Sequence, residues 1–499
     1  MAPLPAPSSV PPIRIQAVHE REPRGAGAYV LYWCTAFRRT GHNFALQRAL
    51  DWCRELHRPL VVLEAVRIGY RWACDRFHRF LLDGMGINAS RYRRAGILYL
   101  PYLEPGRGAG RRLLAQLASR ACVVVTDDFP EFFHPLAVQA AAPQIPVRFE
   151  KVDSNGLFPM RATDRVFSTA RSFRLHLQRH LGEHLEATPK ADPLAGLRIP
   201  VLDRPPRGIA SRWPLASQAL LGGNGAHGLE HLPIDHRVGP VPGVGGGAQA
   251  GREALRRFLD ERLDRYVCER NDPDADAASG LSPYLHFGHL SAHEILAALA
   301  AREGWTPRRL STRALGGARG GWGFSENAEA FLDQLVTWRE LGFNYCSHRD
   351  DVAELSSLPA WSLATLHEHA RDRREAIYDL AELEAAQTHD PLWNAAQRQL
   401  VREGRIHNYL RMLWGKKVLE WTRSPQEALA TLIELNNKYA LDGRDPNSYS
   451  GILWIFGRYD RAWGPERPVF GKVRFMSSRA TLRKVHLKRY LERFGPPKT

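Results

Sequence analysis

The sequence predicts two folded parts, an α/β domain with a doubly wound parallel sheet followed by an all-helical domain. Short apolar runs alternate with helical segments up to about residue 150, and from residue 251 almost every apolar segment has helical spacing. A long region rich in Pro and Gly separates the two patterns. A chain of 499 residues is also too long for a single hydrophobic core. We expect a disordered arm at 1–25, the α/β domain at 26–165, an interdomain linker at 166–250 and the helical domain at 251–495.

The α/β domain is indicated by five short runs that have the composition of buried strands. They lie at 29–33, 60–63, 97–100, 122–125 and 145–149. Strands that alternate with helices form a parallel sheet, and such sheets bind ligands at the carboxyl ends of their strands. No GxGxxG follows the first strand and GxxxxGK[ST] is absent, which excludes the common dinucleotide fingerprint and the P-loop.

Composition limits the possible partners and the compartment. A net charge of +16 favours a polyanion such as nucleic acid, with a solvated Arg-rich surface as the alternative. No apolar run approaches the roughly 20 residues of a membrane span, and the Pro-rich N-terminus lacks the apolar core of a signal peptide. The six cysteines form no CxxC pair, so we expect free thiols and no metal site. We expect a cytoplasmic, nucleoid-associated monomer.

The helical domain is predicted from apolar residues that recur at intervals of three and four. The expected helices are 252–267, 289–303, 327–343, 363–371, 379–386, 397–421 and 425–437, and Gly404 is a candidate break within the sixth. Trp414 and Trp421 are two turns apart on one face, roughly 10 Å along the helix. Indoles at this spacing can pass an electron, although core packing is the more common role of a helical tryptophan.

Two polar segments are candidates for binding chemistry. The small hydroxyl residues and the glycine of 276–283 lie just before a predicted helix and could donate to a phosphate, with an ordinary N-cap as the alternative. In the second segment, Asn436 and Asn437 precede 441–447, a polar loop with strong turn residues. No Ser/His/Asp order, HExxH or paired-carboxylate motif stands out, so the sequence gives no sign of acid–base or metal catalysis.

Together, these segments resemble the photolyase/cryptochrome family, specifically the class II cyclobutane pyrimidine dimer photolyases. The resemblance covers most of the chain, because family-like blocks follow one another in the family's order. The most specific blocks are SGLSPYLHFG, THDPLWNAAQ, HNYLRMLWGKKVLEW, LNNKYALDGRDPN and RPVFGKVRFM. The N-terminal YVLYWCTAFRRTGHNFAL is similar to that family's antenna domain.

The resemblance implies a folded FAD, held in its reduced form inside the helical domain. Residues matching the cofactor site are Tyr266, Ser279, Gly280, Leu281, Ser282, Asn344, Asn408, Arg411, Asp442 and Asp445. Arg411 and Asp442 match a salt bridge beside the flavin ring, and Asn436 matches the asparagine at flavin N5. Trp393, Trp414 and Trp421 match the chain that re-reduces the flavin, in an order that the sequence leaves open. An antenna chromophore, a deazaflavin or a folate, is a further possibility.

The implied reaction is light-driven repair of pyrimidine dimers in double-stranded DNA by electron transfer from excited FADH⁻. Glu340 matches a carboxyl that hydrogen-bonds the dimer bases. Trp454 and Trp463 match aromatic walls near the lesion, and we group Arg461 with them as a DNA contact. The alternatives are a cryptochrome-like photoreceptor without repair activity and a flavin-free helical DNA-binding protein. Repair of 6–4 photoproducts, with His286 or His407 as an acid, is a further alternative.

Overall fold

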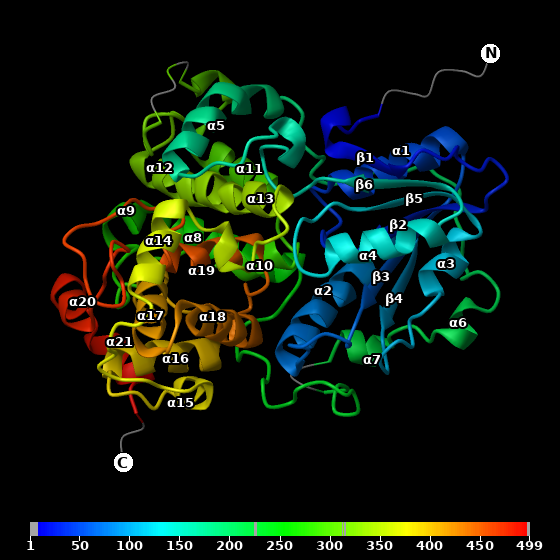
Figure 1. Ribbon diagram of the computed structural model, residues 1–499. Coiled ribbons are helices and arrows are strands. Elements are labelled where there is room, and N and C mark those ends of the chain that lie inside the picture. The colour runs from blue at the N-terminus through cyan, green and yellow to red at the C-terminus, as the bar shows by residue number, and fades with distance from the viewer. Residues whose placement is uncertain (1–7, 224–226, 312, 314–315, 497–499) are drawn as a thin grey trace. The chain divides into compact units, whose positions relative to one another are not determined.

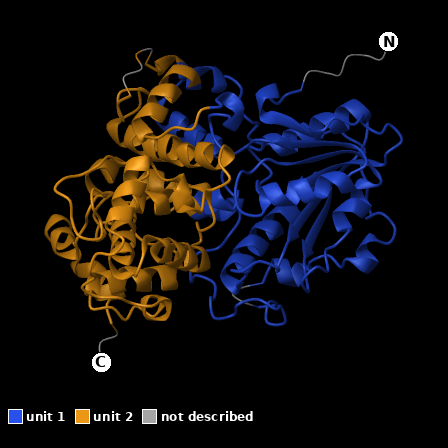
Figure 2. Ribbon diagram, in the orientation of Figure 1, with its two compact units in different colours: residues 1–164, 181–254, 283–307 blue, residues 165–180, 255–282, 308–499 orange. Residues whose placement is uncertain are grey.

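A computed structural model describes residues 8–223, 227–311, 313 and 316–496 (Figure 1). The chain divides into two compact units, which we describe separately (Figure 2). The first contains residues 1–164, 181–254 and 283–307, and the second contains 165–180, 255–282 and 308–499. These units differ from the expected domain bounds, because 283–307 belong to the first unit and 165–180 to the second.

The first unit is built on a six-stranded sheet, as expected for a doubly wound fold. Its strands are β1 (Ile15–His19), β2 (Tyr29–Cys34), β3 (Leu60–Val66), β4 (Leu98–Leu103), β5 (Ala121–Asp127) and β6 (Arg148–Val152). They are ordered β1-β6-β5-β2-β3-β4, and every neighbouring pair is parallel except β1 with β6. Strands β3 and β4 lie on one side of β2, and β5 and β6 lie on the other. The strand order therefore reverses at β2.

Edge strand β1 corrects the prediction of a disordered arm at 1–25. Ile15 pairs with Val152 and Ala17 with Glu150 across the antiparallel edge. This strand is short and half-buried, so it lacks the apolar run by which the five other strands were recognised. The predicted disorder of residues 1–7 lies outside the described residues.

Apolar burial organises the α/β layers of the first unit. Helices α1 (Phe44–Leu56), α2 (Asp75–Arg94), α3 (Leu113–Ala118) and α4 (His134–Ala141) follow successive strands. The side chain of Asn43 caps α1 by accepting from the N–H groups of Ala45 and Leu46. Leu31, Val61 and Val124 are fully buried in the core that these layers enclose.

The expected linker, 166–250, is not an extended connection. It begins with α5 (Ala170–His184) and continues through the short helices α6 (Ile209–Arg212) and α7 (Gln218–Leu221). From residue 181 on it belongs to the first unit, where Ala216 donates to the carbonyl of Pro101 at 2.8 Å. Glycine and proline in this region therefore mark an irregular but packed path, and Trp213 anchors it in the core of the sheet.

Nearly all regular structure of the second unit is helical, which confirms the predicted fold class. Its main helices are α8 (Ala248–Glu261, which begins in the first unit), α9 (Tyr266–Glu269), α12 (Glu326–Leu332), α13 (Arg339–Ser347), α14 (Ala360–Glu368), α15 (Leu380–Glu384), α16 (Pro391–Glu403), α17 (Asn408–Trp421), α18 (Pro425–Tyr439), α19 (Pro446–Ile455), α20 (Ser478–Lys484) and α21 (Lys488–Phe494). Helix α10 (Ser282–His286) and helix α11 (Ala292–Glu303) belong to the first unit apart from Ser282.

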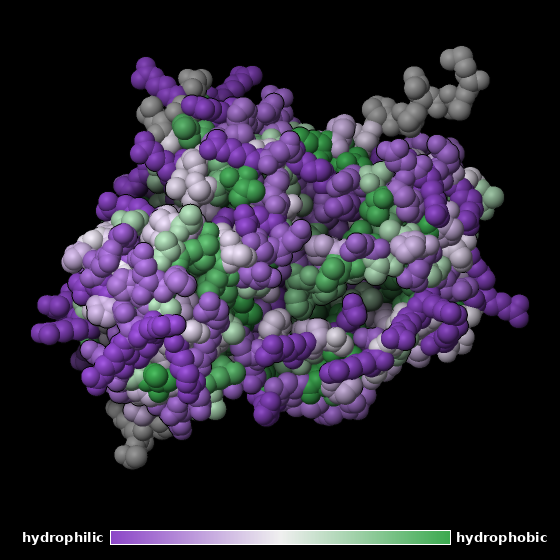
Figure 3. All heavy atoms as spheres, viewed as in Figure 1, coloured by the Kyte–Doolittle hydropathy of each residue, from purple (hydrophilic) through white to green (hydrophobic). Residues whose placement is uncertain are grey.

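One detail of the helical prediction is confirmed and one helix is new. Gly404, the candidate break, divides the expected helix 397–421 into two, because it adopts a left-handed φ of 63° and ends α16. Helix α19 was not among the expected helices; it begins at the end of the predicted polar loop, and Asp445 caps its start. Among the described residues, none of the helices has both the length and the apolarity that a membrane span requires. Hydrophilic side chains cover most of the face seen in Figure 3.

Candidate functional site

The Arg411–Asp442 pair joins α17 to the turn between α18 and α19. The guanidinium donates from Nη2 to Oδ1 of Asp442 at 2.9 Å and from Nη1 to Oδ2 at 3.4 Å. Burial alone would raise the pKa of the Asp442 carboxyl, but the charge and hydrogen bonds of Arg411 hold it below its ordinary value. Asp442 is therefore an anion at neutral pH with a guanidinium fixed beside it.

Asn436 and Asn437 connect the end of α18 to the loop that carries Asp442. Nδ2 of Asn436 donates to Oδ1 of Asn437 at 3.2 Å and to the hydroxyl of Ser448 at 3.1 Å. The Ser448 hydroxyl in turn donates to the main-chain carbonyl of Asp442 at 2.8 Å. The predicted flavin-contacting asparagine and the predicted salt bridge thus belong to one hydrogen-bonded network.

The loop 279–282 reaches the same network through its last residue. The Ser282 hydroxyl is hydrogen-bonded to the Asp442 carboxylate. Gly280 has a φ of 70° and no atom within 4 Å of the position a Cβ would occupy. Leu281 N–H donates to the Ser279 hydroxyl at 3.4 Å, which stabilises the turn. The loop therefore presents an open main chain beside Asp442, as a phosphate-binding segment requires.

Asn344 and Tyr266, two further residues predicted to bind the cofactor, are buried by local packing. Asn344 donates from Nδ2 to the carbonyl of Arg165 at 2.9 Å and accepts from the N–H of Phe167 at 3.4 Å. The Tyr266 ring lies edge-on to Phe331, with centroids 5.7 Å apart. The contacts of these two residues thus explain their burial without a cofactor.

Asn408 and Asp445 lie at helix starts. Asn408 is the exposed first residue of α17, three positions before Arg411. Asp445 caps α19, where its carboxylate accepts from the N–H of Asn447 at 2.9 Å. The cap orients the turn that contains Asp442.

The three predicted tryptophans form one continuous array. The Trp393 and Trp414 ring centroids are 6.4 Å apart with planes only 7° from parallel, and Trp393 and Trp421 are 5.7 Å apart at 67°. Trp393 is therefore the middle member, an order that the sequence did not provide. The Trp393 indole N–H donates to the Trp414 carbonyl at 3.0 Å, and the Trp414 indole N–H donates to Oε1 of Gln397 at 3.0 Å. All three rings are buried.

The array ends beside residues that reach the surface. The ring centroid of Trp421 lies 5.5 Å from that of Tyr378 and 5.1 Å from that of His389. His389 is exposed and Tyr378 is half-buried. Trp421 is thus the member from which the array connects to solvent.

The predicted lesion-contacting residues occupy two regions of the helical unit. Glu340 is buried on α13, directly after a π-helical turn at 333–338. Trp454 is half-buried on α19, and Trp463 follows in the next loop with the Arg461 guanidinium carbon 4.4 Å above its ring. Indole faces that remain partly exposed can stack on bases.

Three charged residues around these tryptophans were missed from the sequence. Lys416 is fully buried on α17 beneath Trp454, and Asp460 and Arg474 form a salt bridge of 2.7 Å beside Trp463. The only sequence signal for Lys416 was its place within an apolar stretch of a helix, and lysine is rarely buried. Nothing in the spacing of Asp460 and Arg474 indicated that they would meet.

The residues around Arg411 fit a flavin. Nε of Arg411 is buried and has no hydrogen-bond partner within the described part of the chain. A buried donor left unsatisfied costs about 1–3 kcal/mol, so a bound group with acceptor atoms would relieve that cost. An isoalloxazine ring carries such acceptors, and the cation is suited to a reduced, anionic ring. Elsewhere, the six cysteines are free thiols as predicted, and no cluster of metal-ligating side chains occurs among the described residues.

The chain is similar over nearly its full length to several photo-lyases. The deoxyribodipyrimidine photo-lyase of Methanothermobacter thermautotrophicus is 34% identical over 483 residues, which cover 96% of this chain and 97% of that protein. The deoxyribodipyrimidine photo-lyase of Oryza sativa subsp. japonica is 34% identical over 498 residues, with 96% and 89% covered. No family model matches the chain.

Solved structures with the same fold come from this group and from the cryptochromes. A bacterial class III photolyase from Agrobacterium tumefaciens superposes with a TM-score of 0.65 at 18% identity, covering 94% of this chain and 86% of the other. A cryptochrome from Synechocystis superposes with a TM-score of 0.64 at 16% identity, covering 93% and 88%. Because its full-length relatives exceed 30% identity, the chain belongs to the deoxyribodipyrimidine photo-lyase family.

Proposed function

We propose that this chain repairs cyclobutane pyrimidine dimers in double-stranded DNA under blue light. The observation that carries the proposal is the identity of 34% to a photo-lyase across 96% of the chain. The expected cryptochrome alternative has weaker support, because the cryptochrome likeness has 16% identity and carries the fold alone. A net charge of +16 supports a DNA partner. We further propose a monomer in the cytoplasm, associated with the nucleoid.

Bound FAD in its reduced form would supply the photoexcited electron that opens the cyclobutane ring of the dimer. We assign Arg411, Asp442 and Asn436 to the flavin ring, and the open loop 279–282 to the phosphates. Arg411 places a fixed positive charge where a reduced ring would carry negative charge, which favours that redox state. Asn436 is held by Ser448, so its amide is oriented before the cofactor binds.

We assign the three tryptophans to re-reduction of the cofactor. Trp393 contacts both of the others, so electrons would pass along the array through its ring. We place Trp421 at the outer end, since it lies against exposed His389, and Trp414 at the cofactor end of the array. The two hydrogen-bonded indoles are rigidly oriented, which keeps the spacing of the rings constant.

We assign lesion binding to Glu340, Trp454, Trp463 and Arg461. A damaged base pair costs less to unpair than an intact one, so the dimer can be extruded from the helix. Glu340 would accept hydrogen bonds from the dimer bases, while the two indoles would stack on exposed base faces and Arg461 would contact the backbone. His407, one of the two histidines considered as an acid for 6–4 repair, is neutral at neutral pH, because burial lowers its pKa to about 4.

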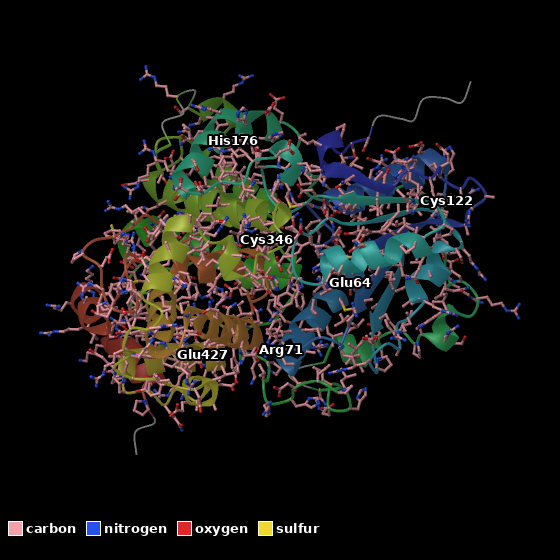
Figure 4. All side chains as sticks on the ribbon, in the orientation of Figure 1. Glu64, Arg71, Cys122, His176, Cys346 and Glu427 are labelled. Carbon is pink, nitrogen blue, oxygen red and sulfur yellow. The ribbon has the colours of Figure 1, made fainter. Side chains whose placement is uncertain are left out.

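An antenna chromophore, a deazaflavin or a folate, would bind in the α/β unit. The support is a buried polar cluster at the carboxyl ends of β2 and β3, where doubly wound sheets hold ligands. Glu64 lies in this cluster (Figure 4), and burial raises its pKa. Arg38 opposes that rise from 3.4 Å. The Thr35 hydroxyl is buried without a hydrogen-bond partner in the described residues.

Absorbance and repair measured on one preparation test the function. Protein reconstituted with FAD should bind it stoichiometrically and, after photoreduction, should restore dimer-containing oligonucleotides under blue light and not in the dark. Bound flavin that photoreduces without any repair would favour the photoreceptor alternative. A protein that takes up no flavin would refute the proposal.

A further inference from the structure

Cations and indoles alternate in one stack in the helical unit. The Arg461 guanidinium carbon lies 4.4 Å from the Trp463 ring centroid, and that of Arg474 lies 4.1 Å from Trp463 and 5.6 Å from Trp454. The ammonium of Lys416 lies 4.9 Å from the Trp454 centroid. We call these five residues the cation–indole stack. It runs from exposed Arg461 to Lys416, which has no exposed surface.

One carboxylate fixes the outer part of the stack. Asp460 accepts from Nε and Nη2 of Arg474 at 2.7 and 3.0 Å, from the Trp463 indole N–H at 3.2 Å and from the Arg461 main-chain N–H at 2.9 Å. Burial would raise the pKa of Asp460, but these donors hold it below its ordinary value. The carboxylate therefore stays charged and keeps the Arg474 guanidinium beside both indoles.

Lys416 fixes the inner end. Its ammonium donates to the carbonyl of Ile455, the last residue of α19, where a cation complements the helix dipole. The same helix carries Trp454, so the bond connects the charge to the segment that presents the indole. A charged lysine without solvent contact is costly, and an apolar side chain of similar volume would usually pack as well or better. A role of this charge in holding the Trp454 indole would explain why a lysine is buried here.

We propose that Lys416 and Asp460 are positioning residues for lesion recognition, which hold the Trp454 and Trp463 indoles ready to contact an extruded dimer. The proposal rests on the proposed function of the two tryptophans. Half-exposed rings have only part of their surface packed, so their rotamers would otherwise be fixed only when DNA binds. Cation–π contacts and the Asp460 hydrogen bonds fix them beforehand, and this preorganisation favours the damaged site over intact duplex.

This role differs measurably from a general contribution of positive charge. A lysine that contacts phosphate strengthens binding to every sequence and steepens the salt dependence. Lys416 is buried and cannot reach a phosphate, so its loss should leave the salt slope and the affinity for undamaged DNA unchanged. What should fall is the ratio of affinities for damaged and undamaged duplex.

The test compares Lys416→Met with Lys417→Met by dark binding to matched duplexes with and without one thymine dimer. Lys417 is the adjacent control: it is also buried, carries the same charge and pairs with Glu420 at 2.7 Å outside the stack. The expected result is about a tenfold loss of discrimination for Lys416→Met and none for Lys417→Met. An equal loss for both duplexes, or full discrimination in Lys416→Met, would overturn the proposal.

Asp460→Asn tests the outer anchor and remains informative if Lys416→Met does not fold. It should also lower discrimination while retaining flavin binding, and unchanged discrimination in this folded variant would contradict the proposal. A pH series adds a readout that packing alone would not change. Burial lowers the pKa of Lys416 to about 7, with Asp460 and Arg474 as the charged groups facing it, so wild-type discrimination should decline as pH rises through 7.

The pH series also separates the inference from the function on which it rests. Lys416→Met should lose the decline, and the same decline in the variant would contradict the assignment to Lys416. If wild-type protein binds both duplexes equally, the proposed function and this inference fail together. If it prefers the dimer and both stack variants keep that preference, only the inference fails.

Discussion

The buried charge of Lys416 should make folding stability depend on pH in a defined direction. Burial lowers its pKa from 10.5 to about 7. Between these values the unfolded chain binds a proton that the folded chain does not, so wild-type stability should rise with pH across the window. At about 1.4 kcal/mol per pH unit, the contribution between pH 6 and pH 9 is about 2.5 kcal/mol. Lys416→Met removes this contribution while keeping a similar volume.

Urea unfolding at half-unit steps from pH 6 to pH 9 measures the effect, with a probe that reports the helical unit. The quantity of interest is the difference in unfolding free energy between wild type and Lys416→Met, since other titrating groups cancel in it. Relative to wild type, the variant should be most stable at pH 6 and lose that advantage towards pH 9. A difference that stays constant over the range would refute a charged, buried Lys416.

Three further predictions address the array, the lesion site and the fold. Trp393→Phe should bind flavin normally but photoreduce it far more slowly, because both ring contacts of the array pass through Trp393; unchanged bleaching of oxidised flavin under blue light would contradict this. Glu340→Gln should keep the flavin and lower the repair yield about tenfold, as expected for loss of a charged hydrogen bond, and a wild-type yield would remove Glu340 from the lesion site. Gly288→Ala should lower Tm by several degrees or more, because a Cβ there would lie 1.8 Å from the carbonyl of Ala36 at a φ of 72°; an unchanged melting curve would show that the turn adapts.

The fold was predictable where apolar patterns are long and continuous. The inner strands are fully buried runs such as Val123–Val125, and their positions followed directly from composition. Strand β1 was missed because none of its five residues is fully buried, so its sequence has no continuous apolar run. Glycine and proline in the expected linker indicate an irregular backbone, but they do not reveal whether that backbone packs against the domain. Here it does pack, because Trp213 lies in the core of the first unit.

The candidate site was predictable only through its resemblance to a known family. Spacing along the chain showed that Trp414 and Trp421 share a helix face, but Trp393 comes from α16, and its place between them depends on how two helices pack. Likewise, Asp460 and Arg474 meet through a loop whose path no periodic pattern specifies. A buried lysine such as Lys416 contradicts the usual preference of its residue type, so composition argues against its actual position.

Blue-light repair of a dimer-containing oligonucleotide by the FAD-reconstituted, photoreduced protein tests the central claim most directly. The account predicts conversion to intact thymines that depends on light, follows the absorbance of the reduced flavin and is absent in the dark. Equal conversion in light and darkness, or no conversion by protein that holds reduced flavin and binds the oligonucleotide, would contradict it.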